Sequence, residues 1–135
     1  MSYGISAALQ SAVFQHLAAD ATLAGLVGTD IYDALPPGTA PQLYVSLGPE
    51  DVKDRSDQSG PGADHVFTVS VVSEAAGFQT AKQVATAISD ALHGADLTLS
   101  RGHLTSLWFQ QAQARRVADA GTRRIDLKFR ARVGE

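Results

Sequence analysis

The sequence predicts an α+β fold, a two-layer sandwich in which two helices pack on one face of a mainly antiparallel sheet. From residue 124 to residue 133, polar and apolar residues alternate without interruption, as in a strand with one buried and one solvent-facing side. Two other segments, 4–19 and about 73–93, carry apolar residues at three- and four-residue steps, which is typical of helices that cover a sheet. Residues 1–135 are therefore expected to form a single domain.

The first helix is expected over 4–19, where Ile5, Leu9, Ala12, Val13, His16 and Leu17 form the stripe. Asp20 is placed to cap a second, short helical turn, and Gly28 is a suitable stop for it. Residues 31–34 are expected to form a short strand. The segment 35–41 contains three prolines, which exclude regular strand pairing there.

The middle of the chain predicts two strands joined by a long loop. Residues 42–47 alternate between apolar and polar positions, and Gly48-Pro49 is expected to end that strand. Residues 50–64 are polar, charged and rich in glycine, so we expect a long mobile loop there. The segment 65–73, rich in valine and threonine, is expected to return as a strand that pairs with the first.

Ser73 or a residue soon after it is expected to cap the second helix, which runs to about His93 and has Gly94 as its stop. A strand is expected over 104–116, followed by a turn at 118–121 and a final strand that reaches Val133. Since a short turn joins these two strands, they are expected to pair as an antiparallel hairpin. The final strand should turn its apolar residues towards the helices and its charged residues, Arg124, Asp126, Lys128, Arg130 and Arg132, towards the other face.

The charge distribution is uneven along the chain. Residues 1–100 hold three of the eleven basic and eleven of the fourteen acidic residues, a formal charge of −8, whereas residues 101–135 carry +5. Such a split indicates either two surfaces of opposite charge for different neighbours or ordinary solvated faces that pair with each other. No apolar run approaches the ~20 residues that span a bilayer, and the chain opens without a secretion signal, so we expect a cytoplasmic protein with no membrane partner.

The residue types do not indicate an enzyme. There is no cysteine, and the histidines at 16, 65, 93 and 103 show no metal-ligand spacing. No nucleophile elbow and no phosphate-binding loop is present. We therefore predict no catalytic residues, no metal and no cofactor.

Two kinds of partner remain for the basic face of the last strand. A nucleic acid would meet the arginines with its phosphates, but the overall net charge of −3 argues against a dedicated nucleic-acid binder. The other partner is a neighbouring protein subunit, because opposite charges fix the orientation of two different surfaces in a ring. An exposed Trp108 or Phe109 would then be an anchor of that interface; the alternative is that both are core residues of a monomeric domain.

The order and spacing of several segments also carry a resemblance. These segments are Ala7-Ala8-Leu9-Gln10, Leu17-Ala18-Ala19-Asp20, Ile31-Tyr32-Asp33-Ala34-Leu35-Pro36, the stretch from Ala40 to Gly48, the strand Val66 to Ser73, Ala91-Leu92-His93-Gly94, and the stretch from Gly121 to Ala131. With them the chain resembles the small tail-completion or tail-terminator proteins of long-tailed phages, prophages and phage-like gene transfer agents.

The resemblance implies a structural protein of a virion or phage-like particle, assembled in the host cytoplasm and located at the tail–head junction. It implies a homo-hexameric ring that caps the tail tube, stops polymerisation of the major tail tube protein, and joins the tail to the head connector or stopper protein. DNA would pass through the lumen without sequence-specific binding. The alternatives are a minor tail or baseplate subunit and a small nucleic-acid-contacting module with a basic face.

The candidate interface combines the predicted loop and the last strand. Its residues are Lys53, Asp54, Arg55, Asp57, Arg124, Lys128, Arg130 and Arg132. The loop 50–64 is expected to order on assembly, because long polar segments often fold when they meet a partner.

Overall fold

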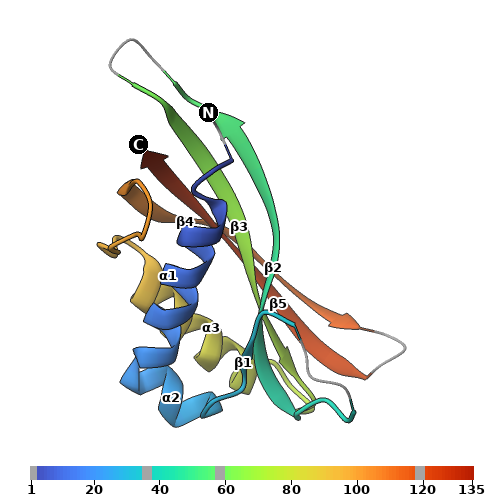
Figure 1. Ribbon diagram of the computed structural model, residues 1–135. Coiled ribbons are helices and arrows are strands. Elements are labelled where there is room, and N and C mark those ends of the chain that lie inside the picture. The colour runs from blue at the N-terminus through green and yellow to red at the C-terminus, as the bar shows by residue number, and fades with distance from the viewer. Residues whose placement is uncertain (1–2, 35–37, 57–59, 118–120) are drawn as a thin grey trace.

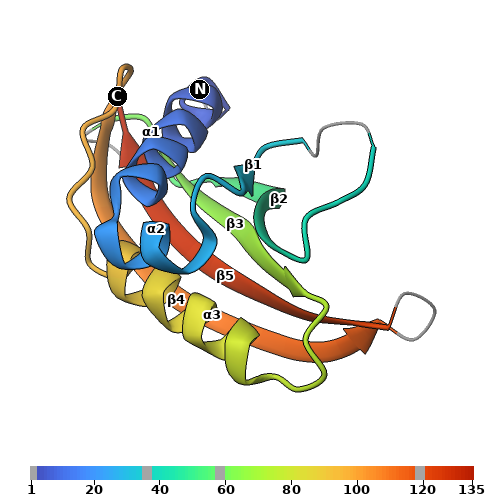
Figure 2. The same cartoon turned by 90° about the horizontal axis from the view of Figure 1, so that it is seen from below.

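The computed structural model describes residues 3–34, 38–56, 60–117 and 121–135, and within them helices pack on one face of a sheet (Figure 1). The helices are α1 (Ser6–Ala19), α2 (Ala21–Val27) and α3 (Gln79–Leu92). The strands are β1 (Ile31–Tyr32), β2 (Leu43–Asp54), β3 (Gly62–Ser73), β4 (His103–Val117) and β5 (Thr122–Gly134). The predicted α+β two-layer architecture is confirmed, and Figure 2 shows the helices gathered on one side of the sheet.

The strands follow the order β1-β2-β3-β5-β4 across the sheet. β1 pairs with β2 in parallel, and every other neighbouring pair is antiparallel. The two predicted hairpins, β2–β3 and β4–β5, are both present. They are joined through β3 and β5, which pair along their whole length from Gly62 opposite Gly134 to Ser73 opposite Arg123.

The hydrophobic core lies between the helices and the sheet. The apolar residues of β5 are buried as predicted, and they are Ile125, Leu127, Phe129, Ala131 and Val133. The ring of Phe129 stacks on Phe67 of β3 and meets Phe109 of β4 edge-on, with ring centroids 5.8 Å apart in both contacts. Leu17 of α1 and Ile88 of α3 are fully buried in the same cluster. Burial of these side chains is the main force that holds the helices against the sheet.

The predicted helix ends near Asp20 are confirmed. The Asp20 side chain accepts a hydrogen bond from the Leu23 backbone N–H at 2.9 Å, which caps α2. Gly28 follows α2 with φ of +61°, a backbone conformation that only glycine adopts readily. Gly94 lies just beyond α3 with φ of +74°.

The prediction of a long mobile loop over 50–64 is wrong. β2 continues to Asp54 and β3 already begins at Gly62, with Lys53 opposite Asp64. Gly48-Pro49 does not end the strand, because an irregularity in the register between Leu47 and Glu50 accommodates the proline. The polar residues up to Asp54 and from Gly62 onward belong to a hairpin with one solvent-facing side, so the expectation that the whole segment orders only on assembly loses its basis.

The second helix begins later than predicted. Ser73 is the last residue of β3, and its hydroxyl accepts a hydrogen bond from the Ala75 backbone N–H in the connection that follows. α3 starts at Gln79 without a side-chain cap. Of the turn predicted at 118–121, residues 118–120 lie outside the described residues, and Gly121 has φ of +65°. None of the described helices is long and apolar enough to cross a membrane.

Candidate interface on the open face of the sheet

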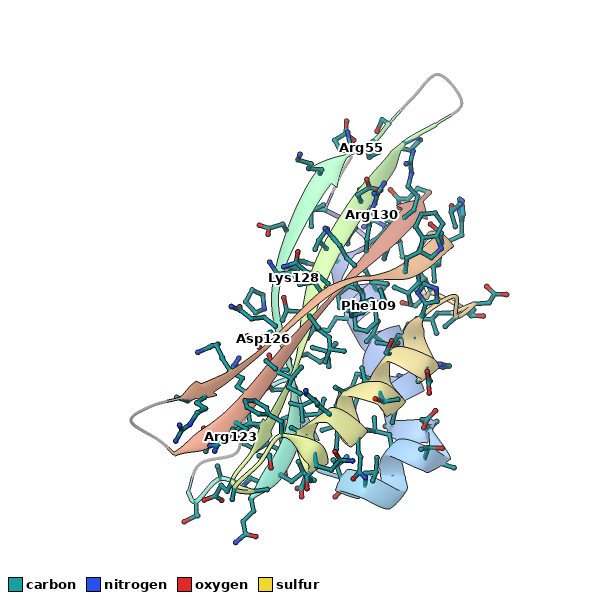
Figure 3. The ribbon with its side chains drawn as sticks, turned by 180° about the vertical axis from the view of Figure 1, so that it is seen from behind. Arg55, Phe109, Arg123, Asp126, Lys128 and Arg130 are labelled. Carbon is teal, nitrogen blue, oxygen red and sulfur yellow. The ribbon has the colours of Figure 1, made fainter. Side chains whose placement is uncertain are left out.

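The side of the sheet that faces away from the helices is here called the open face (Figure 3). Because side chains alternate along a strand, β5 buries its apolar residues and presents its charged residues on this face. The register brings Asp64 of β3 opposite Arg132, and Ser70 of β3 opposite Asp126. On the other side of β5, Trp108 of β4 lies opposite Arg130. The open face therefore gathers residues from four strands around the charged row of β5.

Asp64 is the centre of an arginine cluster. Arg55 Nε lies 3.0 Å and Arg130 Nη2 lies 3.2 Å from Asp64 Oδ2, and Arg132 Nε lies 3.7 Å from Oδ1. The carboxylate side chain is 5% exposed, whereas the three arginine side chains are 40–47% exposed. Ion pairs to a buried carboxylate hold the guanidinium groups in place, while their outer N–H groups stay accessible.

The cluster has more positive than negative charge. One carboxylate faces three guanidinium groups, and Asp64 Oδ1 has no hydrogen-bond partner among the described residues. A shallow hollow of about 330 Å³ lies beside the cluster and is also lined by Lys53, Asp51 and Lys128. The ammonium of Lys128 takes part in no ion pair among the residues that the structure describes. This part of the open face is therefore suited to an anionic partner.

A second carboxylate, that of Asp126, pairs with two arginines at the other end of the row. Asp126 Oδ1 accepts hydrogen bonds from Ser70 Oγ at 2.6 Å and from Arg124 Nε at 2.9 Å, and Arg115 lies 3.7 Å from Oδ2. Partial burial raises the pKa of Asp126, but the hydrogen bonds from Ser70 and Arg124 and the two arginine charges outweigh it, so the pKa lies below its ordinary value. Asp126 is therefore ionised at neutral pH and fixes Arg124.

The candidate interface residues fall into two groups. Lys53, Arg55, Lys128, Arg130 and Arg132 line the hollows beside Asp64, whereas Arg124 belongs to the Asp126 group. Asp54 is exposed at the end of β2 and accepts a hydrogen bond from Ser56. Asp57 lies outside the described residues.

Sequence reasoning missed Asp64, the residue that organises the cluster. Asp64 was assigned to the predicted loop, so its place on β3 opposite Arg132 was hidden. The sequence feature that could have placed it on the strand is the alternation of residues 62–73. In that pattern Asp64, Val66 and Thr68 share the face opposite to that of Phe67. Trp108 and Phe109 are both exposed, by 53% and 38%, one on each side of β4.

Three of the four histidines make structural contacts, in separate places of the fold. His16 Nε2 lies 2.8 Å from the carbonyl oxygen of Ala91, which links α1 to α3. His93 Nδ1 accepts a hydrogen bond from the Phe109 backbone N–H at 3.0 Å. His65 is fully buried, with Nδ1 3.3 Å from Glu50 Oε2, and Glu50 also accepts a hydrogen bond from Ser6.

Comparison with known proteins agrees with the resemblance seen in the sequence. The chain has no significant match among curated protein sequences. A solved structure of the virion of a native gene transfer agent particle contains a chain that is 63% identical, with a TM-score of 0.94 over 99% of this chain and 100% of that one. The model of the family described as tail completion protein gp17 matches residues 11–134. The chain therefore belongs to the tail completion protein gp17 family, and the predicted resemblance to phage tail-completion proteins is confirmed.

Proposed function

We propose that this protein is a structural component of a phage-like particle that forms a ring at the head-proximal end of the tail tube. In this role it ends polymerisation of the major tail tube protein and joins the tail to the head connector. Family membership and the close match to a chain of a gene transfer agent virion support a structural role in the tail. DNA would pass through the ring without sequence-specific contacts.

The observation that carries the proposal is the uncovered open face. Among the described residues, Arg55, Arg130 and Arg132 surround one buried carboxylate, that of Asp64, and Lys128 beside them takes part in no ion pair, so positive charge is in surplus there. A sheet face with fixed, partly exposed guanidinium groups is suited to an acidic protein surface, because planar guanidinium groups bind carboxylates in defined geometry. We assign this face to contacts with the neighbouring tail or connector protein.

The test is the length of tail tubes assembled with and without the protein. Purified tube protein is polymerised with the wild-type chain or with the variant Arg130→Glu/Arg132→Glu, and tubes are measured by electron microscopy. We expect the wild-type chain to bind one tube end and stop its growth, and the variant to bind poorly. Lys82→Glu is the matched control, because Lys82 lies on α3, away from the open face.

Other outcomes separate the rival functions. Tubes that grow to unlimited length with the wild-type chain bound to neither end would contradict the proposal. Binding only at the tube end that lies away from the head in an assembled particle would indicate a baseplate subunit instead. Binding to free DNA that weakens with salt at a log slope of about −0.9 for each phosphate contacted would indicate a nucleic-acid-contacting module.

A further inference from the structure

The two outer edges of the sheet are both unpaired over much of their length. Among the described strands β4 pairs with β5 only, and residues 108–116 are exposed on both sides of the strand. At the opposite edge, β1 covers only Val45 and Ser46 of β2, so no described strand pairs with the outer side of β2 from Leu47 to Asp54. Figure 1 shows the C-terminal end of β4, marked by its arrowhead, extending away from the helices. Free strand edges present backbone N–H and C=O groups that can pair with another chain.

We propose that the β4 edge of one copy pairs with the β1–β2 edge of the next copy and so joins the sheets of neighbouring subunits. This inference rests on the proposed ring and names the contact that would build it. The two edges are different surfaces, so the contact is head-to-tail and can close into a ring.

The charges of the two edges are complementary. β4 contains no acidic residue and carries Arg115 and Arg116 near its end. β1, β2 and the residues that flank β1 carry five acidic residues and one lysine, which are Asp30, Asp33, Glu50, Asp51, Asp54 and Lys53. The side chains of Arg116 and Asp33 are exposed and take part in no hydrogen bond or ion pair within the described part of the chain. Opposite charges at facing edges favour this pairing over pairing of two identical edges.

The apolar surfaces of the two edges are complementary as well. A groove of about 930 Å³ runs between α1 and the β1–β2 edge, and Tyr3, Phe14, Tyr32 and Leu47 line it. At the other edge, Phe109 is 38% exposed on the helix side of β4. In a joined sheet the helix-covered sides of both copies face the same way. Phe109 of one copy would then point towards the groove of the next, as interface aromatics commonly fill a neighbouring pocket.

The strand directions place these features opposite one another. β4 runs antiparallel to β2 within one copy. In the proposed ring, neighbouring copies are related by rotation about an axis along the strands, and such a rotation preserves strand direction. β4 of one copy would therefore pair with β2 of the next copy in the antiparallel direction. This pairing brings the Arg116 end of β4 beside β1 and Asp33, and it brings the middle of β4, at Phe109, beside the middle of β2, near Leu47.

The absence of cysteine from the chain allows a direct cross-linking test. Ala114→Cys on β4 and Ala34→Cys after β1 are introduced together into the full chain, which is assembled with tail tubes and treated with a short bismaleimide. Both alanines are exposed. The two edges are four strand spacings of about 4.8 Å apart within one copy, too far for a link inside one chain.

We expect a ladder of linked oligomers from the double variant and only monomers from each single variant. Tubes that are capped normally while the double variant stays monomeric would overturn the strand pairing and leave the proposed function standing. Dimers from Ala114→Cys alone would overturn it too, because they would show that two β4 edges meet. Failure of the wild-type chain to cap tubes at all would instead contradict the proposed function.

Charge reversal provides a second readout that does not depend on the cross-linker. Arg116→Glu and Asp33→Arg should each weaken self-association on tubes at least tenfold, and the two changes combined in one chain should restore it. Lys82→Glu on α3 should leave self-association unchanged. Equal association of the wild-type chain and both single variants would refute the proposed pairing.

Discussion

Arg130 of β5 and Asp64 of β3 form an ion pair across neighbouring strands, with Nη2 of the arginine 3.2 Å from Oδ2 of the aspartate. The two residues are diagonal neighbours, since Arg130 lies directly opposite Val66 and Asp64 lies directly opposite Arg132. One carboxylate thus holds arginines at two successive open-face positions of β5, as well as Arg55 beyond the end of β2. The arrangement keeps several guanidinium groups on one surface without leaving Asp64 as an unpaired buried charge.

Replacement of Asp64 by asparagine should destabilise the fold. The change removes the carboxylate that pairs with Arg55, Arg130 and Arg132, at a position that is 4% exposed. We expect a loss of about 1–3 kcal/mol in the free energy of unfolding, measured by urea denaturation. Asp54→Asn is the control and should change it by less than about 0.5 kcal/mol, because Asp54 is exposed. Equal stability of the two variants would contradict a role for Asp64 in the fold.

The stability of the protein should fall in acid, in part because of Asp126. Its pKa in the folded protein is lower than its ordinary value of 3.8, so the unfolded chain takes up a proton at higher pH than the folded chain does. The stability that this residue contributes is complete above its ordinary pKa and is lost as the pH falls through the lower pKa of the folded state. Glu50 acts in the same direction. Its partial burial raises its pKa, but hydrogen bonds from Ser6 and His65 outweigh that effect, so the pKa is lower than its ordinary value.

The measurement is the free energy of unfolding of the wild-type chain and of Asp126→Asn from about pH 6 to about pH 2.5. The variant should be less stable at pH 6, and its stability should decline less steeply below about pH 4. Parallel curves for the two proteins would show that Asp126 has the same pKa in the folded and unfolded chains.

Phe129→Ala should be among the most damaging single substitutions. The side chain is fully buried and contacts the rings of both Phe67 and Phe109. We expect a loss of about 3–5 kcal/mol, from lost burial and the cavity left behind. Phe109→Ala should cost less than half as much, since Phe109 is already partly exposed. Thermal unfolding of both variants would compare them, and a larger effect for Phe109→Ala would contradict this ranking.

Asp20→Ala should weaken the junction between α1 and α2. The substitution removes the hydrogen bond from the Leu23 backbone N–H, which has no other partner in the first turn of α2. A loss of about 1 kcal/mol is expected from chemical denaturation. Asp90→Ala on the exposed side of α3 should change the stability by less than about 0.5 kcal/mol, which separates the effect of the cap from that of charge.

The local elements were predictable because short-range patterns encode them. The alternation of 124–133 fixed which side of β5 is buried, and the stripe ending at Leu17 fixed the buried side of α1. Asp20 and Gly28 marked the ends of α2, because capping and positive φ each require particular residue types. The polar composition of 50–64 predicts a loop, whereas residues 50–54 and 62–64 belong to the two strands of a hairpin with one side in solvent.

The sequence by itself determined the fold class, the basic and apolar sides of β5, and the resemblance to tail-completion proteins. Only the tertiary structure decided which carboxylates meet the arginines, because Asp64 and Arg130 are far apart in the chain and meet only through the pairing of β3 with β5. It also decided which strands lie at the free edges of the sheet. Strand order depends on pairing between distant segments, and the alternation within one strand carries no information about its neighbour.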